Sequence, residues 1–225
     1  MGGSRDARDA WDRRADSDLY SSIESSRRDW TSDEFFADGR RTVEQAMGWV
    51  GDGVTRGRML EIGCGAGRTA VAFAQLFEHV EGVDISPRMI DAAREQGLPE
   101  NVHLRATDGE SLDPFEDASF DFLFSEHVFQ HIASEPVIAR YLSEIGRVLK
   151  PGAPALLQFD TRHAGLGAAL YDLVPSRLLP RDRRDYMRRY RRSAEWVTAT
   201  AESAGLAVEW ERNADTHWHW FLLRA

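Results

Sequence analysis

Short apolar runs alternate with amphipathic segments along the middle of the chain, which is the pattern of strands and helices that follow one another. The runs are too continuously apolar for half-exposed strands, and they lie at residues 59–62, 80–83, 102–106, 120–124 and 155–159. Helical periodicity links them over residues 68–77, 87–96 and 134–149. Strands that alternate with helices at these short spacings predict a parallel, doubly wound α/β sheet with helices on both faces.

Residues that start and stop helices support these boundaries. Ser86 and Pro87 supply an N-cap and a first-turn proline, and Gly97 would end the helix that they begin. Pro151 and Gly152 would end the long helix that precedes the fifth strand.

The periodic pattern breaks at residues 162–192, which we interpret as an insertion. A capped helix is predicted over residues 193–204. Two further strands, at residues 206–211 and 217–224, can then pair as a hairpin.

The segment before the first strand has a different composition. Residues 1–57 are rich in Arg, Asp and Ser, with widely spaced apolar residues, and they predict two or three amphipathic helices. Asp33 or Ser32 would cap the last of them. We interpret residues 1–57 as a helical cap or lid on a core of residues 58–225, so that the whole forms one compact domain.

Composition narrows the class of protein. The 225 residues include 28 basic and 37 acidic side chains, a formal net charge of −9, and 42% are hydrophobic, which is typical of a globular protein. No apolar run is long enough to span a membrane, and residues 1–14 lack the apolar stretch of a secretory signal, so we expect a cytoplasmic protein. The acidic charge disfavours nucleic-acid binding. Cys64 is the only cysteine, which excludes an internal disulfide.

Three glycines, Gly63, Gly65 and Gly67, follow the first strand and open the next helix. Such glycines let the backbone approach a ligand closely, although a glycine turn can also be purely structural. A dinucleotide-binding pattern would need a third glycine where Arg68 stands. Glu61, just before the turn, suits a cationic ammonium or sulfonium ligand better than a pyrophosphate. A nicotinamide-dependent oxidoreductase is therefore disfavoured.

Acidic residues end or follow successive strands. Asp84 ends the second strand, where a carboxylate can accept hydrogen bonds from both hydroxyls of a ribose, or could instead cap a helix. Asp108 follows the third strand and suits the exocyclic amine of a purine. Together with Glu61, these acids predict a ligand-binding rim at the carboxyl ends of the strands.

Five segments resemble motifs of the class I S-adenosylmethionine-dependent methyltransferases, in their order and in their spacing. They are Glu61–Arg68, Val83–Ser86, Thr107–Gly109, Ser119–Phe122 and Leu149–Gly152. The resemblance spans residues 58–161 and is highly specific for fold and cofactor. It implies a Rossmann-like, mostly parallel seven-stranded sheet with an antiparallel last strand, a helical N-terminal lid, and S-adenosylmethionine as the cofactor.

The resemblance also implies a set of cofactor contacts along this rim. They are Glu61, Gly63, Cys64, Gly65 and Arg68 at the methionine end and glycine turn, Asp84 for the ribose, Ile85 for the adenine face, Met89 on the next helix, Asp108 and Gly109 for the adenine amine, and Ser125 and Glu126 near the sulfonium. Glu126 could instead be an exposed acid that is favoured by a helix dipole.

Two pairs of histidines are candidates for chemistry. His127 and His131 would share one helix face, but Val128 stands where a zinc protease needs its glutamate, so we expect no metal there. Either histidine could be a general base, with His127 favoured because it lies nearer the strand end, or a packed core residue. His217 and His219 would share one face of a strand, and a core role is favoured because no third metal ligand is evident.

The acceptor pocket is predicted to be lined by aromatic side chains of the N-terminal segment. These are Tyr20, Trp30, Phe35 and Phe36, together with His127. The arginines crowded into residues 177–192 could bind an anionic substrate or a carrier protein, or could form a solvated helix face. A single small domain favours a small-molecule acceptor, and we expect no nucleic-acid or membrane partner.

These observations lead to the expectation of a methyltransferase that acts on an oxygen, nitrogen or carbon of a small molecule, in biosynthetic tailoring. Most of the acceleration would come from holding the nucleophile in line with the methyl group and excluding water. The alternative from another class is a non-catalytic, methyltransferase-like module that binds a nucleoside or a partner protein.

Overall fold

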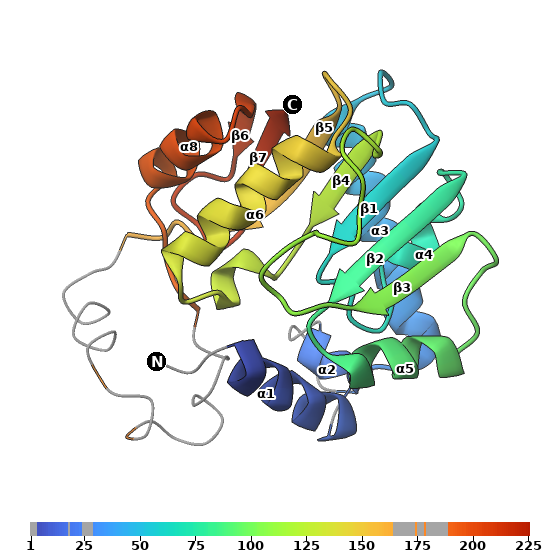
Figure 1. Ribbon diagram of the computed structural model, residues 1–225. Coiled ribbons are helices and arrows are strands. Elements are labelled where there is room, and N and C mark those ends of the chain that lie inside the picture. Colours follow the sequence, from blue (N-terminus) through green and yellow to red (C-terminus); the bar gives the residue numbers. More distant parts are fainter. Residues whose placement is uncertain (1–3, 18, 24–28, 164–173, 175–177, 179–188) are drawn as a thin grey trace.

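A computed structural model describes residues 4–17, 19–23, 29–163, 174, 178 and 189–225 (Figure 1). Within these residues a seven-stranded sheet has the order β3-β2-β1-β4-β5-β7-β6. The strands are β1 Arg58–Ile62, β2 His79–Asp84, β3 Val102–Ala106, β4 Phe122–Ser125, β5 Pro154–Phe159, β6 Ala207–Arg212 and β7 His219–Arg224. Strands β1 to β5 run parallel, and β7 lies antiparallel to both β5 and β6. The predicted fold class and the closing hairpin are confirmed.

Helices cover both faces of the sheet (Figure 1). They are α1 Ser4–Ser17, α2 Leu19–Ile23, α3 Ser32–Val50, α4 Ala70–Phe73, α5 Pro87–Glu95, α6 Glu135–Val148 and α8 Ala194–Ser203, with a 3₁₀ turn at Phe129–His131. The apolar stripes of α6 and α8 pack on one face, and those of α3, α4 and α5 pack on the other. Because both faces are covered, the inner strands are buried along almost their whole length, as their continuous apolar runs predict.

Two predicted boundaries are wrong for local reasons. The helix predicted over residues 68–77 is reduced to α4, because the glycine turn takes up the residues before Ala70. The fourth strand begins at Phe122, since the backbone of Phe120 bonds to Val148 and Lys150 and not to β1.

The cap of α3 also differs from the prediction. Thr31, and neither Ser32 nor Asp33, is its N-cap, and it forms a capping box with Glu34. The Thr31 hydroxyl accepts from the Glu34 N–H while the Glu34 carboxylate accepts from the Thr31 N–H, so two helix-end donors are satisfied.

Of the two C-terminal histidines, His219 lies in strand β7 and His217 lies in the loop before it. His219 begins β7, is fully buried, and stacks on Phe221, while Trp220 points to the opposite face of the sheet. His217 lies before the strand, because the next N–H, that of Trp218, bonds to the Thr216 hydroxyl and not to β5. The core role predicted for His219 is confirmed.

Among the described residues, none of the helices combines the length and the apolar character that crossing a bilayer requires. The predicted insertion at residues 162–192 lies largely outside the described residues.

Candidate active site

The glycine turn after β1 adopts backbone conformations that favour glycine. Gly63, Gly65 and Gly67 have φ of 77°, 49° and 81°. A Cβ on Gly63 would lie 2.0 Å from a methyl carbon of Val128, so no larger residue fits. The turn is tied to β2 by the Gly63 N–H, which donates to the Val83 carbonyl at 2.7 Å. The backbone at this position is therefore fixed and open to a ligand on one side.

Asp84, at the end of β2, holds the turn from the other strand. Its two carboxylate oxygens accept from the N–H of Gly65 at 2.9 Å and from the N–H of Ser86 at 2.8 Å. The N-cap of α5 is Ser86, whose hydroxyl accepts from the Met89 N–H, so the alternative that Asp84 caps the helix is wrong. Burial raises the pKa of Asp84, and the backbone donors oppose that rise. Each oxygen keeps a lone pair for a ligand hydroxyl.

Glu61, on β1, is a buried carboxylate that is only half satisfied. Its side chain is 3% exposed, and one oxygen accepts from the Thr69 hydroxyl. The other oxygen, Oε2, accepts no hydrogen bond from any described residue. Burial raises the pKa of Glu61 to about 7. A cationic ligand group beside Oε2 would supply the missing donor.

We expect Glu61 to make the ligand-free protein less stable as pH rises. The pKa of about 7 in the folded state lies above the ordinary value of 4.5, so protonation of Glu61 favours folding, and that contribution is lost as pH rises through 7. From about pH 5.5 to 8 the loss is roughly 2 kcal/mol. Urea unfolding of wild type and Glu61→Gln over this range measures it. Glu61→Gln should lack this component, and an identical pH dependence in both proteins would contradict the assignment.

Arg68 connects the turn to two other elements. Its guanidinium is almost fully buried, and it donates to Asp38 at 2.7 Å and to Thr42 at 2.9 Å on α3. A second nitrogen donates to Glu126, which follows β4. Glu126 is therefore a buried ion-pair partner, and the alternative that it is an exposed first-turn acid is wrong.

Two glutamine side chains fix the orientation of the histidines near β4. The backbone N–H of His127 can only donate, so the Gln158 atom that it meets at 2.9 Å is the oxygen. The Gln158 nitrogen then faces two acceptors, the His217 carbonyl and, at 3.4 Å, Gln130 Oε1. Gln130 accordingly turns its own nitrogen towards His127 Nδ1 and His131 Nε2, at 3.3 Å from each.

This network assigns the tautomers of both rings. An amide N–H donates, so His127 Nδ1 and His131 Nε2 are acceptors, and the neutral rings carry their hydrogens on His127 Nε2 and His131 Nδ1. A histidine that took a proton at its acceptor nitrogen would have to give up its bond to Gln130.

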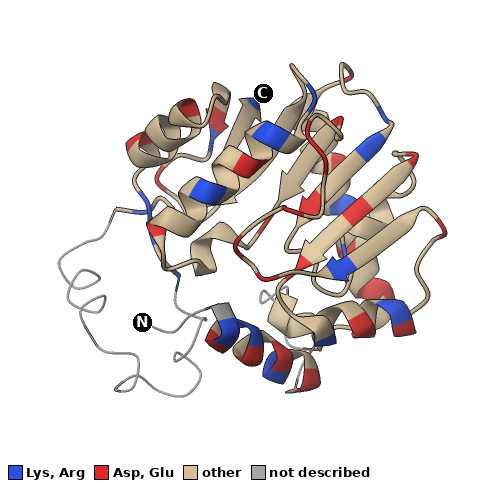
Figure 2. Ribbon diagram, viewed as in Figure 1, with Lys and Arg blue, Asp and Glu red and all other residues tan. Residues whose placement is uncertain are grey.

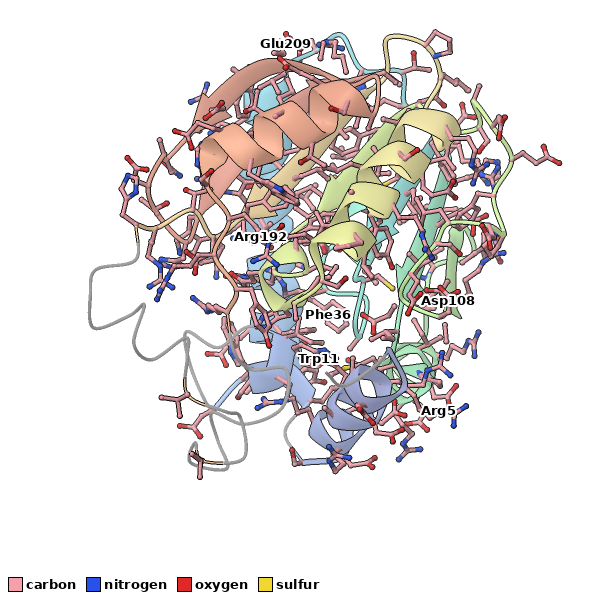
Figure 3. The ribbon with its side chains drawn as sticks, turned by 60° about the vertical axis from the view of Figure 1, so that its left-hand side comes forward. Arg5, Trp11, Phe36, Asp108, Arg192 and Glu209 are labelled. Atoms are coloured by element: carbon pink, nitrogen blue, oxygen red, sulfur yellow. The ribbon has the colours of Figure 1, made fainter. Side chains whose placement is uncertain are left out.

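Helix α1 lies beyond the carboxyl ends of the strands and covers the site (Figure 1). Arg8 donates to the carbonyls of Ile85 at 3.2 Å and Thr107 at 2.9 Å. Trp11, labelled in Figure 3, meets the edge of the His131 ring at 5.4 Å between centroids. Acidic and basic side chains alternate along the rest of α1 (Figure 2), where Asp16 pairs with Arg88 of α5.

These elements enclose a cavity of about 240 Å³. It is lined by twelve of the residues predicted from the sequence, namely Glu61, Gly63, Cys64, Gly65, Arg68, Asp84, Ile85, Met89, Gly109, Glu126, His127 and His131. Residues that the sequence did not predict also line it, among them Ala7, Trp11, Ile23, Thr69, Gln130 and Tyr141, and so does Arg189 of the arginine-rich segment. The turn, the acids and the histidines thus share one cavity.

Two predicted cofactor contacts do not line this cavity. Asp108 is exposed beyond the end of β3 (Figure 3), and one of its oxygens accepts from the N–H groups of Glu110 and Ser111. Ser125 is fully buried, and its hydroxyl donates to the Ile62 carbonyl at 3.0 Å, so it ties β4 to β1.

The four predicted acceptor-wall aromatics also lie away from the cavity. Phe35 is fully buried and is contacted by the rings of Tyr20, Trp30 and Phe36, so these residues form an aromatic cluster of their own. The Tyr20 hydroxyl donates to Gln96 on the far side of α5 from the turn. The N-terminal segment instead contributes Trp11 and Ile23 to the wall.

Comparison with known proteins identifies the family. A family described as a methyltransferase domain matches residues 60–157. The demethylmenaquinone methyltransferase of Deinococcus radiodurans is 33% identical over 55% of this chain and 52% of its own length. The ubiquinone biosynthesis O-methyltransferase of Coxiella burnetii is 32% identical over 67% of this chain and 63% of its own length. Residues 60–157 therefore match a methyltransferase domain, and the chain has the fold of the class I S-adenosylmethionine-dependent methyltransferases. It spans about half the length of the first of these relatives.

Solved structures of other methyltransferases share the fold. The DhpI protein in complex with S-adenosylhomocysteine superposes with a TM-score of 0.70 at 20% identity, over 99% of this chain and 97% of that one. The YcgJ protein of Bacillus subtilis gives 0.59 at 25% identity, over 78% and 72%. At such identities the likeness supports the methyltransferase fold and no more.

The residues of this chain fit the family's cofactor. The unsatisfied oxygen of Glu61 suits the ammonium group of S-adenosylmethionine, and Asp84 suits its ribose hydroxyls. Gly63 and Gly65, between these two acids, also line the cavity. Acceptors of this site thus suit the amino-acid end and the ribose of the cofactor.

Proposed function

We propose that this methyltransferase transfers the methyl group of S-adenosylmethionine to an oxygen, nitrogen or carbon of a small molecule, in biosynthetic tailoring within the cytoplasm. One observation carries the proposal: the acids of the cofactor rim and the histidines after β4 line the same cavity. A cofactor that is held by Glu61 and Asp84 would leave the histidine end for an acceptor. Two relatives are named as a demethylmenaquinone methyltransferase and a ubiquinone biosynthesis O-methyltransferase. These names support a small-molecule acceptor.

The chain's own residues would act mainly by positioning. When bound, the cofactor supplies an electrophilic methyl group. Asp84 would accept from the ribose hydroxyls, Ile85 would pack on the base, and Glu61 would accept from the ammonium group. Helix α1 covers the carboxyl ends of the strands and would exclude water from the cavity. The acceptor's nucleophile would be held close to the methyl group there. A general base is optional in this scheme, and Gln130 already occupies the acceptor nitrogens of both histidines.

Turnover distinguishes this proposal from a non-catalytic binding module. Purified protein with methyl-labelled S-adenosylmethionine and fractionated small-molecule extract should give labelled product, and Asp84→Ala should give none. If the wild-type protein binds S-adenosylhomocysteine but labels nothing across such extracts, the binding-module alternative is favoured.

We expect Arg8→Ala to weaken S-adenosylhomocysteine binding about fivefold. The side chain makes two hydrogen bonds that hold α1 over the site, each worth about 1 kcal/mol, and Asp12 and Asp16 still anchor the helix in the variant. Arg5→Ala is the matched control, because Arg5 lies on the same helix and is exposed (Figure 3). Calorimetric titration measures both affinities, and equal effects of the two substitutions would contradict a specific role for Arg8.

A further inference from the structure

Two arginines line the cavity, and they differ in their partners. Arg68 is held between the carboxylates of Asp38 and Glu126. Arg189, from the far end of the predicted insertion, makes neither a hydrogen bond nor an ion pair with any residue that the structure describes. A half-buried guanidinium that faces a cavity without a carboxylate partner is open to an anionic group of a ligand.

Arg189 lies at the histidine end of the cavity. The N–H of the next residue, Tyr190, donates to the Gln130 carbonyl at 2.7 Å, which fixes the backbone beside the histidines. The pKa of His217 is lowered by burial and then by the positive charge of Arg189 and Arg162. Of these two arginines, Arg162 is neutralised by Asp160.

Charge is therefore divided along the cavity. The carboxylates of Glu61, Asp84 and Glu110 line the cavity at or after the ends of β1, β2 and β3, and the cation of Arg189 lines it beside Gln130. Gln130 occupies the acceptor nitrogens of His127 and His131, so these two nitrogens present no lone pair that would repel an acidic ligand. The cation of Arg189 and the occupied histidine nitrogens both favour a negatively charged ligand group beside Gln130.

We propose that the methyl acceptor carries an acidic group, a carboxylate or a phosphonate-like oxyanion, and that Arg189 binds it. This inference rests on the proposed methyltransferase function, because it assigns the part of the cavity that the cofactor leaves open. Arg189 is a specificity-determining residue in this account. A guanidinium binds either oxyanion in a bidentate way, so their shared chemistry defines the class of acceptor.

The test uses simple probes on the full chain saturated with S-adenosylhomocysteine. Benzoate and phenylphosphonate are the acidic probes, and benzamide is the neutral isostere of benzoate. Calorimetry gives the affinity of each for wild type, Arg189→Gln, Arg189→Lys and the matched control Arg162→Gln, whose arginine does not line the cavity. The titrations are repeated without S-adenosylhomocysteine, and its own affinity is measured for every variant.

We expect at least one anion to bind the wild type about tenfold tighter than benzamide, since charge-assisted bonds are the stronger ones. Arg189→Gln should remove this preference, Arg189→Lys should keep part of it, and Arg162→Gln should not change it. Anions that bind no tighter than benzamide, or a preference that survives in Arg189→Gln, overturn the inference. A loss of S-adenosylhomocysteine affinity in Arg189→Gln also overturns it, because the guanidinium would then serve the cofactor. Failure of the proposed function looks different, since the wild type would either not bind S-adenosylhomocysteine or bind it without labelling any product of the extracts.

Discussion

Replacing Asp84 by alanine is expected to weaken S-adenosylhomocysteine binding at least about 100-fold. The substitution removes the acceptor of two ribose hydroxyls, and hydrogen bonds to charged groups are worth roughly 1.5–3 kcal/mol each. It also frees the N–H of Gly65, so the glycine turn loses its tie to β2. Calorimetric titration measures the affinity directly.

Two further variants separate binding from folding. Asp84→Asn keeps the size of the side chain but places a donor opposite one of the two backbone donors, so it should also bind poorly. Asp113→Ala, an exposed acid outside the cavity, should bind as the wild type does. If folded Asp84→Ala bound S-adenosylhomocysteine with unchanged affinity, the assignment of the ribose site would be wrong.

Gly63→Ala is expected to cost roughly 3 kcal/mol of unfolding free energy and to abolish cofactor binding. The new Cβ would lie 2.0 Å from Val128, in a left-handed backbone conformation with φ of 77°. To relieve the clash, the turn would have to move away from β4 and out of the position that faces the cavity. Urea unfolding and S-adenosylhomocysteine titration measure the two effects.

Gly97→Ala separates the clash from the backbone strain. Gly97 has almost the same φ, 80°, but an added Cβ would meet nothing within 4 Å. This control should lose only about 1 kcal/mol of unfolding free energy and should bind S-adenosylhomocysteine normally. Equal losses in the two variants would show that contact with Val128 does not matter.

The sheet and the cofactor rim could be predicted because local patterns determine them. Continuous apolar runs mark strands that are covered on both faces, and β3 occupies the predicted residues 102–106. The carboxyl ends of neighbouring parallel strands meet at one edge, so Glu61 and Asp84 lie together without any knowledge of the helices.

The docking of helix α1 over the site and the arrangement of the residues around His127 and His131 could not be predicted from local patterns. Phe35 and Phe36 belong to an apolar face at helical spacing with Val43 and Met47, but that spacing does not say whether core or ligand covers the face. Trp11 reaches the cavity only because α1 docks on α5 and the strand ends. The orientation of Gln130 depends on Gln158, 28 residues away, and no short-range pattern records such a pair.

Calorimetric titration of the wild-type protein with S-adenosylhomocysteine tests the central claim most directly, with a nicotinamide dinucleotide as the control ligand. Binding of S-adenosylhomocysteine at one site per chain, without measurable binding of the dinucleotide, is the expected result. A folded protein that ignores S-adenosylhomocysteine, or that prefers the dinucleotide, would contradict the cofactor site built from Glu61, Asp84 and the glycine turn.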